Sequence, residues 1–126
     1  MNFDKNLSMR KFIKGFGYAF SGLVIFFRNE TNGIVQLLAA FVVVLLGWMV
    51  KLSGNEWIVI IGCIAAVLSL EMMNTAIEKL CNHVQPDIHP AIKTIKDIAA
   101  GAVLWMAIAS AVIGCIIFIP KILLLL

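Results

Sequence analysis

Charged side chains are scarce in this chain of 126 residues. They account for 13% of it, compared with roughly 25% in ordinary soluble domains, whereas hydrophobic residues account for 62%. This balance excludes a typical soluble domain. It predicts that a bilayer surrounds most of the chain.

Closely spaced cysteines and conventional nucleotide motifs are also lacking. Cys63, Cys81 and Cys115 are too widely separated for a metal motif, and we interpret them as small core residues. No G-x-x-x-x-G-K-[ST] loop is present, and Phe20 stands where a G-x-G-x-x-G motif beginning at Gly15 needs its last glycine. Any nucleotide site in this chain is therefore unconventional.

Three apolar segments are long enough to cross a bilayer as helices. They cover residues 34–50, 57–80 and 98–119, and the first is at the lower limit of the roughly 17 to 25 residues that a crossing requires. The segment 82–90 contains two prolines and is expected to be a loop, and Pro120 is expected to follow the end of the last helix.

The segment 7–28 differs from these spans. Phe12, Phe16 and Phe20 recur at helical spacing, whereas the basic residues lie mostly to one side of them. This pattern predicts an amphipathic helix in the membrane interface. The predicted fold class is therefore an all-α membrane protein with one interfacial and three transmembrane helices, and residues 1–126 are expected to form a single domain.

Basic residues are distributed unevenly about the spans. Five precede the first span and three lie around the loop between the second and third, which leaves only Lys51 and Lys121 for the other side. The positive-inside rule therefore places the amino terminus in the cytoplasm, in a multi-pass protein of the cytoplasmic (inner) membrane. No nucleic-acid-binding signature is present. The net charge of +3 therefore reflects the orientation in the membrane, and no nucleic acid partner is expected.

One face of the second span carries polar groups. Four residues share this face through their spacing of i, i+3, i+4 and i+7: Glu71, Asn74, Thr75 and Glu78. Ionisable groups at membrane depth are costly and usually mark functional sites. A snorkelling or helix-pairing cluster explains Glu78 near the helix end, but it does not explain four polar groups in register.

The depth of these groups indicates different roles. With Trp57 as an interfacial anchor and about 20 residues per crossing, Glu71 lies roughly 9 Å inside the cytoplasmic boundary and Glu78 lies at that boundary. Glu71 is then a candidate base toward a hydroxyl at that depth. Glu78 is a candidate ligand of Mg²⁺, with Glu30 as the second acid, because magnesium takes one or two carboxylates and completes its shell with water and phosphates.

Further polar groups precede the third span. Lys96 and Asp97 are expected at the cytoplasmic start of that helix, where lysine neutralises phosphate charge. Lys93 is expected to be a solvated or snorkelling side chain. For His89, the roles of ligand and of loop-packing residue both stay open.

Two motifs resemble those of a known family. They are E-x-x-N-T-A-I-E over residues 71–78 and K-D-I-A-A-G-A-V over residues 96–103, with a His-Pro pair at 89–90 between them. Together they resemble the signature of the small prokaryotic integral-membrane diacylglycerol kinases, a family that includes undecaprenol kinases. The similarity covers nearly the whole chain, because G-Y-A at 17–19 and Asn-Glu at 29–30 fall where the family carries its amino-terminal helix and first acid.

The resemblance implies a homotrimeric enzyme that transfers the γ-phosphate of ATP, bound with magnesium, to the hydroxyl of a membrane lipid at the cytoplasmic face. By motif position it implies that Glu71 is the catalytic base and that Glu30 and Glu78 bind the metal and the nucleotide. It implies further contacts with ATP from residues along the chain: Lys11, Tyr18, Asp87, His89, Lys96 and Asp97. Asn74 and Thr75 would support the substrate.

Departures from the family pattern concern the lipid more than the reaction. Lys11 stands where the family often has arginine, which keeps the charge but loses a bidentate fork. Ile34 and Gln36 stand where some undecaprenol-type members carry arginine and histidine. Diacylglycerol and undecaprenol therefore both stay open as the lipid alcohol.

The alternative function is an ion or proton pathway through Glu71 and Glu78 in a small oligomeric membrane protein. Such a pathway should continue toward the outer side, where residues 57–70 offer almost no polar groups. The gathering of Glu30, Lys96 and Asp97 at one membrane boundary favours the kinase.

Overall fold

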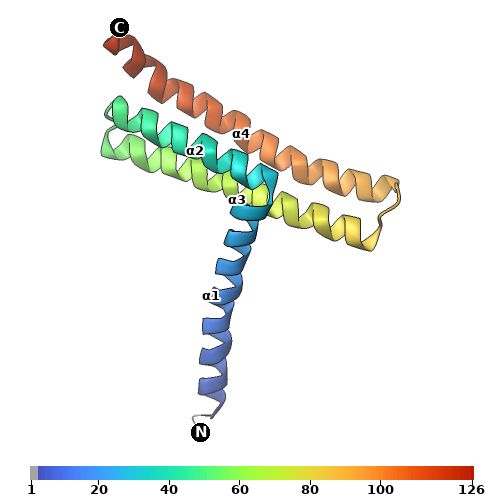
Figure 1. The fold of residues 1–126 in the computed structure, drawn as a ribbon. Coiled ribbons are helices and arrows are strands. Elements are labelled where there is room, and N and C mark those ends of the chain that lie inside the picture. The colour runs from blue at the N-terminus through green and yellow to red at the C-terminus, as the bar shows by residue number, and fades with distance from the viewer. Residues whose placement is uncertain (1–2) are drawn as a thin grey trace. The chain divides into compact units, whose positions relative to one another are not determined.

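Four α-helices make up the part of the chain that the computed structural model describes, residues 3–126 (Figure 1). They are α1 (Phe3–Asn29), α2 (Thr31–Met49), α3 (Gly54–Val84) and α4 (Pro90–Leu125). The all-α fold class is confirmed. Residues 1 and 2 of the predicted domain lie outside the described residues.

Three of these helices, α2, α3 and α4, are long and apolar enough to cross a membrane. Their many exposed large apolar side chains form a surface suited to contact with acyl chains. Helix α1 is not among the candidate spans, which agrees with the predicted interfacial helix. Its side chains between residues 4 and 20 are exposed, and the rings of Phe12 and Phe16 stack edge to face at 5.1 Å.

Two compact units divide the chain, residues 1–37 and residues 38–126. In the first, Glu30 is the single residue between α1 and α2, and its carbonyl accepts the N–H of Ile34 at 3.1 Å. Gly33 lies against the backbone of Phe26, where an added Cβ would be 2.8 Å from the carbonyl carbon. The absence of a side chain at Gly33 therefore permits the close turn that carries Glu30.

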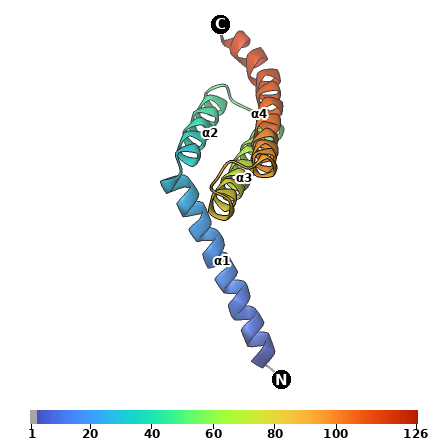
Figure 2. The ribbon, with the colours of Figure 1, turned by 90° about the vertical axis from the view of Figure 1, so that its right-hand side faces the viewer.

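In the second unit, α3 and α4 form an antiparallel pair that lies side by side in both views (Figures 1 and 2). Lys96 of α4 donates to the Asn82 side chain of α3 at 2.7 Å, and at the opposite end of the pair Lys121 lies 2.9 Å from the carboxylate of Glu56. At about 1.5 Å per residue, both helices are longer than the roughly 30 Å hydrocarbon core, so they extend into the interface.

Helix α2 ends in a Schellman motif. The N–H of Leu52 bonds to the carbonyl of Gly47 at 3.1 Å, and the N–H of Lys51 bonds to that of Trp48 at 3.3 Å. Lys51 has the left-handed conformation that this motif requires, with φ of 58°. Glycine is the usual residue there, because a Cβ in this conformation costs about 1–2 kcal/mol.

Helix α3 begins with a capping box that lies before the expected span of residues 57–80. The Ser53 hydroxyl accepts the backbone N–H of Glu56 at 3.3 Å, and the Glu56 carboxylate accepts the N–H of Ser53 at 2.9 Å. The S-x-x-E spacing was the available signal, and the helix therefore starts at Gly54.

Replacing Ser53 by alanine should lower the free energy of unfolding by about 1 kcal/mol, because the backbone N–H of Glu56 loses the hydroxyl that caps it. Thermal unfolding of the purified protein in detergent measures this change. Ser69→Ala on an exposed position of the same helix is the control, and an equal loss in both variants would show that the cap contributes nothing.

Two expected helix ends were wrong. The loop expected over 82–90 spans only 85–89, because α3 continues to Val84 and the restriction that Pro86 places on its predecessor takes effect only at Gln85. Helix α4 begins at Pro90, since proline suits the first turn, and it continues through Pro120 to Leu125. Proline is tolerated inside membrane helices when the freed backbone groups find other partners.

Candidate active site

Glu71 is the one buried charged or polar residue in the region from residue 4 to residue 126, with 7% of its surface exposed. It lies on α3, in a helix that is otherwise apolar for most of its length. A buried carboxylate is costly unless it is paired, and no hydrogen bond or ion pair to this side chain occurs within the described part of the chain. The structure therefore holds an acid where packing alone would favour a hydrophobic residue.

The polar face of α3 becomes more accessible from Glu71 onward. Asn74 and Thr75 are half-buried, and Glu78 is exposed. A rise of about 1.5 Å per residue separates Glu71 and Glu78 by roughly 10 Å along the axis. One carboxylate is thus withdrawn from solvent while the other is open to it.

Asn82 extends this face by one more turn and joins it to α4. It follows Glu78 at i+4, and its Oδ1 accepts a hydrogen bond of 2.7 Å from Lys96 Nζ. The lysine charge is therefore held one helical turn from Glu78. We did not predict Asn82 from the sequence, although the i, i+4 continuation of the stripe was a sufficient signal.

Asp97 lies one residue beyond Lys96 and is exposed. Its carboxylate is 2.6 Å from Lys93 Nζ one turn earlier on α4. Both side chains are more than 60% exposed, so this pair contributes little to stability. Lys93 is solvated, as its sequence context indicated.

The loop between α3 and α4 contains Asp87 and His89. His89 is the N-cap of α4, and its Nδ1 accepts the backbone N–H of Ala91 at 3.2 Å. This contact caps the first turn of α4 and does not involve Nε2. Asp87 is exposed three residues before the helix begins.

The other predicted site residues belong to the first unit. Lys11 and Tyr18 are exposed side chains of α1, with Tyr18 76% exposed, and Glu30 lies between α1 and α2.

The acids of the second unit suit magnesium better than a metal with a full protein cage. Within residues 3–126, no three His, Cys, Asp or Glu side chains gather to hold a metal ion. Magnesium needs only one or two carboxylates, because water and phosphates complete its shell. The exposed Glu78 carboxylate, beside a lysine suited to phosphate, fits that donor set.

Fold and site together define a polytopic membrane protein with an acidic and amide-bearing face that runs from a buried position to an open helix end. The chain belongs to the prokaryotic diacylglycerol kinase family, whose profile matches residues 17–118. It is therefore a lipid kinase, and the resemblance seen in the sequence is confirmed.

Relatives extend over nearly the whole chain. It is 39% identical over 118 residues to undecaprenol kinase of Bacillus subtilis (strain 168), covering 94% of this chain and 96% of that protein. It is 28% identical over 111 residues to diacylglycerol kinase of Escherichia coli (strain K12), covering 85% of this chain and 88% of that protein. Both relatives are named as lipid kinases.

Proposed function

We propose that the protein transfers the γ-phosphate of ATP to the hydroxyl of a membrane lipid alcohol, with Mg²⁺, at the cytoplasmic face. The observation that carries this proposal is the buried Glu71 at the inner end of a polar face that opens at Glu78. A lipid hydroxyl reaches the first acid from the bilayer. A nucleotide reaches the second from water.

In the proposed step, the Glu71 carboxylate accepts the proton of the lipid hydroxyl while the hydroxyl oxygen attacks the γ-phosphorus. The bond between that phosphorus and the β–γ bridging oxygen breaks, and ADP leaves. Lys96, held by Asn82, offsets phosphate charge. Glu30 and Glu78 would hold magnesium, which neutralises charge on the phosphates when bound.

The remaining proposed contacts with ATP come from Lys11, Tyr18, Asp87, His89 and Asp97, and Asn74 and Thr75 would support the lipid. We also propose that residues 1–126 act as one kinase domain within a homotrimer. Its amino terminus and active site would face the cytoplasm, in the inner membrane. The lysine asymmetry supports this orientation, and the family supports the other assignments.

For the lipid alcohol we propose undecaprenol. The support is the higher identity to the undecaprenol kinase of Bacillus subtilis, 39% over 94% of the chain, than to the diacylglycerol kinase of Escherichia coli, 28% over 85%. Radiolabelled phosphate transfer from ATP, with purified protein and each lipid alcohol in turn, should give the higher kcat/KM with undecaprenol. A higher value with diacylglycerol would overturn the lipid assignment but not the reaction.

Glu78→Gln should raise the apparent KM for MgATP and also slow turnover, because a neutral amide is a weaker ligand for magnesium than a carboxylate. Titrating ATP and Mg²⁺ separately in the transfer assay measures both effects. Glu71→Gln is the matched control, since it removes the other charge of the same face. An unchanged KM for MgATP in Glu78→Gln would contradict the metal role.

A further inference from the structure

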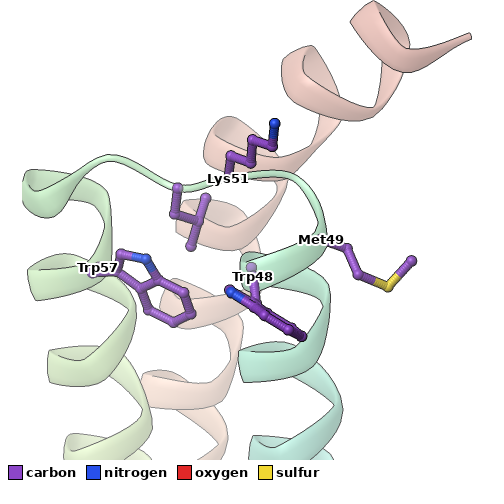
Figure 3. A pocket seen from close by; sticks show the side chains of 6 residues that line it. Trp48, Met49, Lys51 and Trp57 are labelled. Atoms are coloured by element: carbon purple, nitrogen blue, oxygen red, sulfur yellow. The ribbon is translucent and has the colours of Figure 1, made fainter.

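A cleft lies at the opposite end of α3 from Glu78, where α2 turns into α3. Six residues line it: Gly47, Trp48, Met49, Lys51, Leu52 and Trp57. Figure 3 shows Trp48 of α2 and Trp57 of α3 below Lys51, which lies on the turn between the helices. The cleft thus combines apolar walls with one cation at its edge.

The walls of this cleft are held in place by close packing. An added Cβ at Gly47 would lie 2.8 Å from Leu52 Cδ1 and 3.0 Å from Trp57 Cη2, so the glycine lets both side chains approach α2. Trp48, the other tryptophan that lines the cleft, is 75% exposed. Tryptophan is favoured at the boundary between acyl chains and headgroups, so this end of the helices lies at headgroup level.

Lys51 is the unpaired cation at this end of the described helices. Lys121, the other lysine here, is engaged with Glu56, whereas no ion pair or hydrogen bond to the Lys51 amine occurs in the described chain. Lys51 also occupies the left-handed position of the Schellman motif, where glycine is the unstrained residue. A strained residue with a free charge points to a role outside folding.

We propose that this cleft binds a phospholipid with an anionic headgroup. The phosphate lies at Lys51, and the upper part of an acyl chain lies between Trp48 and Trp57. The site is separate from the proposed kinase site, because it is at the other end of α3. The proposal of lipid binding requires only that the protein lies in a membrane.

The test uses the full chain, with Trp105→Phe so that Trp48 and Trp57 are the remaining tryptophans. The protein is placed in phosphatidylcholine vesicles that contain acyl-brominated phosphatidylglycerol or acyl-brominated phosphatidylcholine, and tryptophan quenching gives the relative association constant. One basic side chain at a membrane surface predicts about a fivefold preference for the anionic lipid.

Lys51→Gly should remove this preference without unfolding the protein, because glycine suits the left-handed position. Lys51→Arg should keep it. Lys14→Gln, which removes a basic residue from α1, is the charge-matched control and should leave the preference unchanged. Inorganic phosphate in excess should not relieve the quenching, because the lipid is also held by its acyl chain.

Equal quenching by the two brominated lipids in the Trp105→Phe protein would overturn the proposal. A preference that survives in Lys51→Gly, or one that inorganic phosphate abolishes, would overturn it as well. Since no outcome depends on ATP or on phosphate transfer, the result stands apart from that of the kinase assays.

Discussion

Replacing Glu71 by glutamine should lower kcat by about 10²- to 10⁴-fold and leave the apparent KM for MgATP nearly unchanged. The amide keeps the size of the side chain but cannot accept the proton of the lipid hydroxyl. Because Glu71 is buried about two helical turns from Glu78, its loss should not disturb the nucleotide end of the face. Transfer assays at varied MgATP and saturating lipid measure the two parameters.

Thermal unfolding in the same detergent serves as the control for the Glu71→Gln variant. Replacing the one buried acid of the described chain by a neutral isostere should not destabilise the fold, because a neutral side chain is less costly to bury. A KM for MgATP that rises as much as in Glu78→Gln would contradict the separate roles of the two acids. Full activity in Glu71→Gln would show that Glu71 is not the base and would leave the transfer reaction itself in place.

Glycerol should be a poorer acceptor than a lipid alcohol by about 10³-fold or more, although both carry a primary hydroxyl. A lipid anchored in the bilayer presents its hydroxyl at the depth of Glu71, which makes the reaction effectively unimolecular, whereas glycerol must be captured and oriented from water. A factor of about 10³ corresponds to roughly 4 kcal/mol, which is within the range that orientation supplies.

Phosphate transfer to undecaprenol, diacylglycerol and glycerol in the same mixed micelles provides the comparison. Glu71→Ala gives the background for each acceptor, and only the Glu71-dependent rate is compared. Similar rates with glycerol and with the lipids would show that the depth of the buried acid has no bearing on catalysis.

The membrane class and the polar face follow from the sequence alone, because both depend on local patterns. Long apolar runs require a bilayer whatever their neighbours are. The spacing from Glu71 to Glu78 places these acids on one face of any α-helix. The motifs at 71–78 and 96–103 likewise indicated the family before any contact was known.

Tertiary structure decided which polar side chains of α3 and α4 are buried and which of them are paired. Glu71 and Glu78 share a face, but only the folded chain withdraws the first and exposes the second. Lys96 and Asn82 are 14 residues apart, and their hydrogen bond exists because a short loop brings α4 back along α3. Helical periodicity relates residues three or four apart, whereas burial and ion pairing depend on residues that the fold brings together from distant positions.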